Sequence, residues 1–207
     1  MTKTERKESV RQARKEMYRQ LIFEAAERVF SEQGFDGAKM QDVAAEAGLS
    51  LGTLYAIFAG KAELFQAIQE SRRRELMEHA RGEAPSNASA VAQLLHAVRA
   101  YAEFLLDHPN FLRIHSYEGR ALGLAKAPAW APADDQPDPG IELMLEAFER
   151  CIAEGALYDD DALLMARMTV AAEQALLADY FDRPETADRA RLLERAQLYV
   201  KRSFIRP

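Results

Sequence analysis

Apolar residues recur at intervals of three and four positions along most of the chain, which is the period of amphipathic α-helices. In the first third of the chain this pattern predicts a helix over about residues 12–33, ended by Gly34. Two short helices are predicted at about 39–47 and 51–58, and a long one at about 61–81. A helix and two shorter ones are therefore expected to precede the long helix over 61–81.

The same period continues through the rest of the chain and predicts further helices. They are expected at about 89–107, from Pro109 onward, at 141–154, from a cap at 159–161 to about Phe181, and after Pro184. The complete pattern predicts an all-α protein of about nine helices, with a three-helix unit at the N-terminal end and a helical bundle after it.

The last two predicted helices have more apolar surface than one neighbour can cover. The eighth is apolar nearly all round, and the ninth carries two adjoining apolar stripes. We expect one stripe to face the chain's own body and the other to face the same pair of helices in a second subunit, which makes a homodimer. The alternative is that both helices pack entirely within one chain. The residues expected at the dimer interface are Leu164, Ala171, Ala175, Ala178, Leu192, Ala196 and Tyr199.

Residues 120–139 interrupt the helical pattern with four prolines and the single tryptophan, Trp130. Loops of this length in compact domains are usually functional lids or disordered segments. The sequence leaves open which of the two this segment is. Trp130 either covers an apolar cavity or anchors the loop to the core.

The composition is that of a soluble globular protein, with 207 residues, 48% of them apolar and 29% charged. No apolar run approaches the ~20 residues that span a membrane, and the charged N-terminus is not followed by the apolar segment of a signal peptide. We therefore expect a cytoplasmic protein with no membrane partner. The only cysteine, Cys151, excludes an intrachain disulfide and a cysteine-based zinc site.

The net charge of −6 argues against nucleic-acid binding until its distribution is considered. Residues 1–20 contain seven basic and three acidic residues, a local charge of +4, whereas the chain from Ala62 onward carries −7. This asymmetry favours a basic end that binds nucleic acid and an acidic body. The alternative for the basic end is a solubilising tail. Residues 1 to about 12 are polar, and we expect them to be frayed.

One stretch, Met40 to Lys61, contains the signals of a helix, a tight turn and a second helix. Gly48 stands where the first helix needs a terminator with positive φ, and Ser50 is placed to cap the helix that follows. Gly52 and Thr53 lie in the first turn of that helix, where no bulky side chain prevents close approach to a nucleic-acid backbone. We therefore expect a helix-turn-helix.

The segment A-A-E-A-G-L-S-L-G-T-L-Y-A-I-F-A-G-K-A-E-L-F, Ala44 to Phe65, resembles the DNA-binding domain of the TetR family of bacterial transcriptional regulators. The preceding helix A-A-E-R-V-F-S-E-Q-G-F, Ala25 to Phe35, is similar as well. The combination of G-T-L-Y with a following F and K at fixed spacing makes the resemblance specific, although it covers only about a quarter of the chain. The chain departs from the family's usual residues at positions 38, 39, 51, 56 and 57, so the operator sequence is not predicted.

The resemblance implies a DNA-binding transcriptional regulator, expected to be a repressor that a small molecule releases from DNA. It implies a basic arm and helix-turn-helix domain over 1–60 and a ligand-binding and dimerisation domain over 61–207, joined by the long fourth helix. The partners would be a palindromic double-stranded DNA operator, a second copy of the chain and a largely apolar effector. No cofactor and no catalytic activity are expected.

Phosphate contacts are expected from cations at helix starts. Lys39 and Lys61 begin predicted helices, where the macrodipole disfavours a cation unless an anion lies nearby. For Lys61 the resemblance also implies a contact with the DNA backbone, whereas Lys39 is equally well explained as a solvated surface residue. Tyr55 either joins the core or reaches a phosphate. The residues expected at the DNA interface are Arg14, Lys39, Gln41, Ser50, Leu51, Gly52, Thr53, Tyr55 and Lys61.

The C-terminal body carries aromatic, methionine and histidine side chains on helices that the TetR family wraps around a ligand pocket. Each of them alone is explained as an ordinary core residue. Together they indicate a mostly apolar cavity with a few polar groups, suited to an aromatic, lipophilic or amphipathic effector. The residues expected to line it are His96, Tyr101, Phe104, Phe111, His115, Tyr117, Trp130, Met144, Phe148, Met165 and Met168.

Motifs of common enzymes are missing from the sequence. It has no phosphate-binding loop, dinucleotide fingerprint, nucleophile elbow or H-E-x-x-H pair. The four histidines include no pair at i and i+4, so no metal site is expected. Two alternatives to a regulator remain open, a helical-bundle enzyme and a protein-binding adaptor that uses the helix-turn-helix only as a scaffold.

Overall fold

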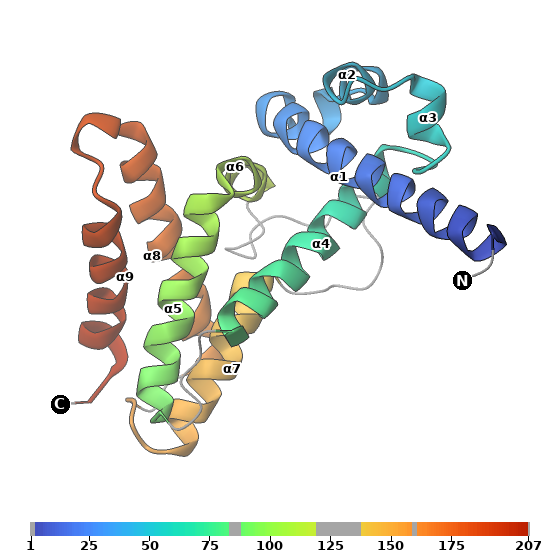
Figure 1. Ribbon diagram of the computed structural model, residues 1–207. Coiled ribbons are helices and arrows are strands. Elements are labelled where there is room, and N and C mark those ends of the chain that lie inside the picture. The colour runs from blue at the N-terminus through green and yellow to red at the C-terminus, as the bar shows by residue number, and fades with distance from the viewer. Residues whose placement is uncertain (1–2, 83–87, 119–137, 159–160, 207) are drawn as a thin grey trace. The chain divides into compact units, whose positions relative to one another are not determined.

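The computed structural model describes residues 3–82, 88–118, 138–158 and 161–206, and its regular elements in these ranges are helices apart from one isolated β-bridge (Figure 1). The predicted all-α class is therefore confirmed. The chain divides into two compact units, residues 1–71 and 72–207. The boundary lies inside the long helix α4 (Lys61–Gly82), whereas the sequence placed it just ahead of this helix.

The N-terminal unit consists of α1 (Lys3–Gly37), α2 (Met40–Glu46), α3 (Leu51–Tyr55) and the first part of α4. The prediction that residues 1 to about 12 are frayed is wrong from Lys3 onward, because these residues continue α1. This extension is rich in Glu, Lys, Arg and Gln, which favour helix, and it contains neither Gly nor Pro. Gly34, with a φ of 69°, kinks the chain where the apolar pattern predicted the helix to end.

Aromatic rings form much of the core of the N-terminal unit. The rings of Phe30 and Phe65 meet edge to face with centroids 5.3 Å apart, and Phe58 packs against Phe23 of α1 at 5.8 Å. Leu54, in the middle of α3, is fully buried. These contacts fix the inner side of α3 and leave its opposite side to the solvent.

The C-terminal unit contains the second part of α4 and five further α-helices. They are α5 (Ala90–Asp107), α6 (Pro109–Glu118), α7 (Pro139–Ala153), α8 (Ala162–Asp182) and α9 (Arg189–Phe204), with a short 3-10 helix at Pro184–Thr186. Helix α7 packs against α5 and α8, and α9 packs against the same two helices (Figure 1). Side-chain caps begin four of the helices, namely Ser89, Asp138, Asp161 and Asp188.

Helix α8 buries one side within its own chain. Met165, Val170 and Leu177 point into the core, whereas Leu164 and Met168 are 48% and 42% exposed. The expectation that Met168 lines the ligand pocket is therefore wrong, because this residue lies on the outer side of the helix. The outer side of α8 stays apolar and available to a neighbour outside the chain.

Two residues of α9 that were expected in the dimer interface lie in the core of their own unit. Leu192 and Ala196 are only 6% and 1% exposed, so the expectation that they contact a second subunit is wrong. Both belong to the stripe that faces the chain's own body. Leu198, which the sequence did not single out, is 42% exposed on the outer side. The other expected interface residues are exposed or half-buried, namely Leu164, Ala171, Ala175, Ala178 and Tyr199.

Candidate functional site

The helix-turn-helix forms as the local sequence predicts. Gly48 adopts a φ of 65° after α2, and the backbone N–H of Leu49 donates to the carbonyl of Ala44 at 2.9 Å, which closes the turn. The hydroxyl of Ser50 accepts from the backbone N–H of Thr53 at 3.1 Å and lies 2.8 Å from the Thr53 hydroxyl. Ser50 therefore caps α3 and holds its first turn in place.

The outer side of α3 and the start of α2 form one polar, accessible surface. Gly52 and Tyr55 are exposed, Tyr55 to 47%, so the tyrosine is not a core residue. Leu51 and Thr53 are half-buried, and Lys39 and Gln41 at the start of α2 are exposed. A Cβ added at position 52 would meet only the Ser50 hydroxyl, at 3.9 Å. A flat, largely unobstructed helix turn of this kind can approach a DNA backbone or groove.

Lys61 makes contacts that sequence reasoning missed. Its ammonium donates to the backbone carbonyls of Phe35, Asp36 and Ala38, at 2.5, 3.1 and 2.9 Å, and lies 4.5 Å from the centre of the Phe35 ring. An ammonium has three N–H donors, and all three are engaged here. We therefore assign Lys61 a structural role in place of the expected phosphate contact. These carbonyl oxygens, which lie at and just after the end of α1, offset the unfavourable position of this cation at the start of α4.

We expect Lys61→Met to destabilise the N-terminal unit by about 1.5–3 kcal/mol, the usual value of hydrogen bonds to a charged group. The substitution keeps an unbranched side chain only one atom shorter and leaves three carbonyls without their donor. Urea unfolding followed by circular dichroism measures the effect. Lys39→Met is the matched control, because Lys39 is exposed and its removal should change stability by no more than ~0.5 kcal/mol. Equal stability of the two variants would contradict the structural role.

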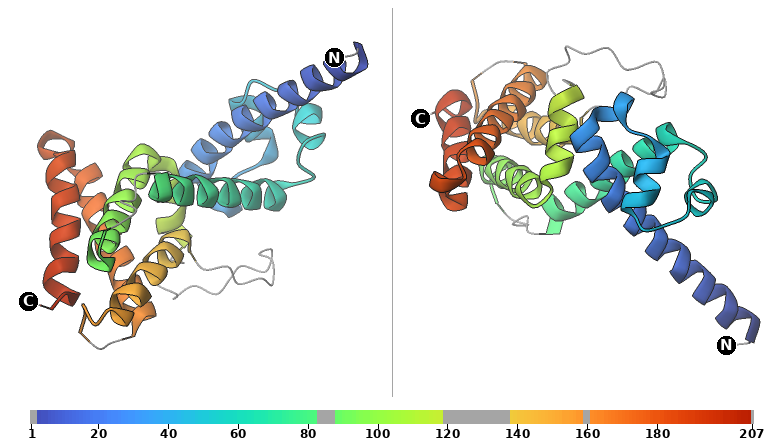
Figure 2. Two further views of the ribbon diagram at one scale, coloured as in Figure 1. Left: turned by 60° about the horizontal axis from the view of Figure 1, so that its bottom comes forward. Right: turned by 90° about the horizontal axis from the view of Figure 1, so that it is seen from above.

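The first turns of α1 carry the basic residues of the N-terminal end. Residues 5–17 are exposed along their whole length, and this part of α1 runs beyond α2 and α3 (Figure 2). The guanidinium of Arg14 donates to the Tyr18 hydroxyl at 2.8 and 3.1 Å and lies over its ring. Arg19 lies over the rings of Phe23 and Phe58. The cations are thus presented on a helix and not on a loose tail.

Most of the residues expected to line a ligand pocket come together in the core of the C-terminal unit. Those found in this core are Tyr101, Phe104, Phe111, Met144, Phe148 and Met165. His96 is half-buried, and its Nε2 is 2.9 Å from the Ala80 carbonyl of α4, so it joins α5 to α4. The side chains of His115 and Tyr117, and all of Trp130, lie outside the described residues.

A buried polar group in the same unit was missed by sequence reasoning. Glu173, in the middle of α8, is 2% exposed, and Thr169, one turn earlier, is fully buried. Burial raises the pKa of the Glu173 carboxyl well above its ordinary value. Burial also raises the pKa of the Tyr101 hydroxyl, and the negative charges of Asp138 and Glu173 add to this shift. The helical period of the sequence does not reveal Glu173, because that period is carried by the apolar positions of this helix.

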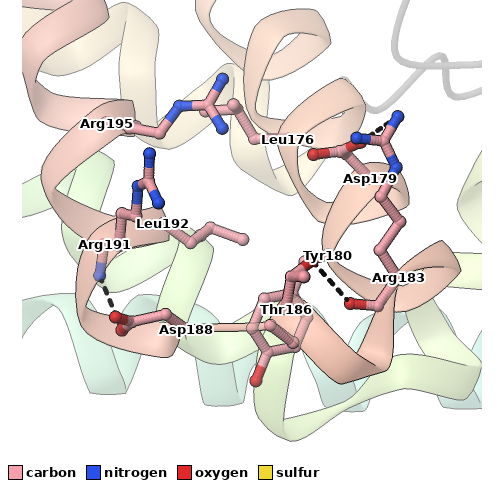
Figure 3. A pocket seen from close by; sticks show the side chains of 10 residues that line it. Leu176, Asp179, Tyr180, Arg183, Thr186, Asp188, Arg191, Leu192 and Arg195 are labelled. Atoms are coloured by element: carbon pink, nitrogen blue, oxygen red, sulfur yellow. Dashed lines mark hydrogen bonds and ion pairs between the residues drawn. The ribbon is translucent and has the colours of Figure 1, made fainter.

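A groove runs between α8 and α9 on the outer side of the C-terminal unit. Figure 3 shows one end of this groove, a pocket of about 220 Å³, with Arg191 and Arg195 of α9 on one side and Asp179 and Arg183 on the other. Asp179 and Arg183 form an ion pair at 3.2 Å. Further along, the groove is lined by Ala172, Ala175, Leu198 and Tyr199 together with charged residues, among them Arg195 and Arg202. No helix in the described residues is long and apolar enough to cross a membrane.

The family model and the relative that match this chain both describe bacterial transcriptional regulators. The family model of bacterial regulatory proteins of the tetR family matches residues 22–68, which contain the helix-turn-helix. The HTH-type transcriptional repressor SCO4008 of Streptomyces coelicolor is 28% identical over 148 residues, 70% of this chain and 71% of that protein.

Two solved structures share the fold over most of their length. The transcriptional regulator FadR from Bacillus subtilis, solved in complex with stearoyl-CoA, is 16% identical with a TM-score of 0.71, covering 87% of this chain and 96% of that one. The ketosteroid transcriptional regulator KstR2 of Mycobacterium tuberculosis is 23% identical with a TM-score of 0.69, covering 91% and 95%. Both similarities concern the fold.

Proposed function

Because the chain belongs to the TetR family of bacterial regulatory proteins and is a transcriptional regulator, not an enzyme, we propose that it acts as a repressor. In this proposal a homodimer binds a palindromic DNA operator. The protein lies in the cytoplasm and is associated with the nucleoid when bound. A small, largely apolar effector releases the dimer from the operator. The observation that carries the proposal is the accessible surface of α3 beside a basic helical extension of α1.

DNA binding would divide between the two elements. Thr53, Leu51 and Gln41 would contact base edges, with Leu51 against a thymine methyl group. Tyr55, Lys39 and the cations of α1, Arg14 among them, would contact phosphates, which supply affinity and orientation but no sequence information. Ser50 and Lys61 would act indirectly, because their hydrogen bonds hold α3 and the start of α4 in place.

The dimer is inferred from the outer sides of α8 and α9. Leu164, Met168 and Leu198 are exposed apolar residues on these two helices, and a groove between the helices continues this surface. Outward-facing arginines of α9 and Asp179 of α8 supply opposite charges for a two-fold arrangement. The two N-terminal units of such a dimer would contact successive half-sites of the operator, about 34–36 Å apart. Binding through two linked units gives a higher affinity than one short recognition helix can give alone.

The effector would bind in the C-terminal unit, among the buried aromatic and methionine side chains. Helix α4 contributes residues to both units, so a ligand that binds one arrangement of the C-terminal unit more tightly can change the population of DNA-competent dimers. Release then requires the ligand to prefer the arrangement that does not fit the operator.

The experiment is a titration of the DNA directly upstream of the chain's own gene, repeated at several salt concentrations. We expect a steep loss of affinity with salt, two chains bound per operator, and a slope reduced by about one unit in Arg14→Gln. Glu24→Gln, on an exposed position of the same helix, is the control and should not reduce the slope. Weak binding that does not depend on salt would favour the protein-binding adaptor instead.

A further inference from the structure

The carboxylate of Glu173 has no hydrogen-bond partner among the described residues, although the side chain is 98% buried. The hydroxyl of Thr169, one turn earlier on α8, is also buried without a partner there. Buried polar groups in folded proteins are almost always hydrogen-bonded, so each exception needs an explanation. Two unsatisfied groups on the same side of one helix indicate that a hydrogen-bonding group is missing.

The neighbours of Glu173 come from two further helices. Tyr101 of α5 and Asp138 at the start of α7 are close enough to interact electrostatically with one another, and Glu173 acts on the same tyrosine hydroxyl. The ring of Tyr101 lies directly against the backbone of α7, since a Cβ at Gly140 would be 2.5 Å from it. The polar atoms of three helices therefore meet at one place inside the unit.

The titratable groups named here are acidic, and among the described residues Glu173 has neither a hydrogen-bond partner nor an ion pair. Burial raises the pKa of its carboxyl, because the ionised form would lose its hydration. Most of the surrounding core is apolar, including Met165, Val170 and Leu177 of the same helix, although the Gln174 side chain also reaches the Tyr101 hydroxyl. A ligand that satisfied this site would need an apolar body and a donor, best a positively charged one.

We propose that Glu173 anchors the effector and that the effector is an organic amine, bound with its protonated nitrogen at the carboxylate and its hydrocarbon part among the apolar side chains. This assignment rests on the proposed effector-binding function of the C-terminal unit. Thr169 and Tyr101 supply additional oxygen acceptors for the remaining N–H groups. Apolar acids, such as fatty acids, are disfavoured at the same position, because their carboxylate would be buried without a cation to balance its charge.

The test uses three probes with the same eight-carbon chain: octylamine, 1-octanol and octanoate. Isothermal titration at neutral pH gives their affinities for the wild-type chain, Glu173→Gln and the control Glu146→Gln, whose site is exposed on α7. We expect the wild type and the control to bind octylamine about tenfold or more tightly than 1-octanol, and octanoate most weakly. In Glu173→Gln the preference for the amine should disappear while 1-octanol binding remains.

Three results would overturn the assignment: equal affinity of the wild type for amine and alcohol, an amine preference that persists in Glu173→Gln, or no binding of octylamine. These titrations contain no DNA, so they are independent of the regulator proposal. If octylamine binds selectively but leaves operator affinity unchanged, the ligand site stands and the release mechanism fails. If the protein binds the operator and no octylamine, the amine site fails and the DNA-binding function stands.

Discussion

Replacing Gly52 with glutamate is expected to reduce operator affinity by about 100-fold or more, because a like charge placed against the DNA costs several kcal/mol. Gly52 is exposed in the first turn of α3, so the new carboxylate would point away from the core. The substitution should not unfold the unit, since an acidic residue near a helix N-terminus interacts favourably with the macrodipole. Fluorescence anisotropy with labelled operator DNA measures the affinity, and thermal unfolding verifies the fold.

Gly52→Ala is the matched control for steric effects. Its Cβ would meet only the Ser50 hydroxyl, at 3.9 Å, and alanine favours helix more than glycine does. We expect this variant to fold normally and to lose much less operator affinity than the glutamate variant. If Gly52→Glu bound the operator as well as the wild type, α3 would not face the DNA, and the assignment of its outer side would have to be abandoned.

The second large effect concerns Glu173 and the pH dependence of stability in the ligand-free protein. Burial raises the pKa of this carboxyl above its ordinary value of 4.5. Below that value the group is protonated in both the folded and the unfolded chain, and it has no pH-dependent cost. As the pH rises from there toward the folded-state pKa, the unfolded chain loses its proton first, so the wild type loses stability.

Glu173→Gln cannot ionise and should escape this loss. Its free energy of unfolding should exceed that of the wild type by an amount that grows with pH, by up to about 1.4 kcal/mol per pH unit between the unfolded-state and the folded-state pKa of Glu173. Urea unfolding at a series of pH values measures the difference. Glu146→Gln, at an exposed site, should show no such growth. A difference between Glu173→Gln and wild type that stays constant with pH would mean that Glu173 is not held in its neutral form.

The local features of the helix-turn-helix could be predicted from the sequence. Gly48 ends α2 with a positive φ, and Ser50 caps α3 through Thr53, as the residue types indicated. A cap, a left-handed glycine and a helical apolar period depend on residues within one or two turns of each other. The helices of the body were found for the same reason, with ends within a few residues of those in the structure.

What the sequence by itself determined is therefore the set of helices, the position of the turn between α2 and α3, and the resemblance to one regulator family. Only the tertiary structure decided that Lys61 binds carbonyls at the end of α1, that Leu192 and Ala196 face their own core while Leu198 and Met168 face outward, and that Glu173 is buried without a partner among the described residues. The physical reason is range: helix formation and capping are set by near neighbours in the chain, whereas the covered side of a helix and the reach of a long polar side chain depend on residues tens of positions away.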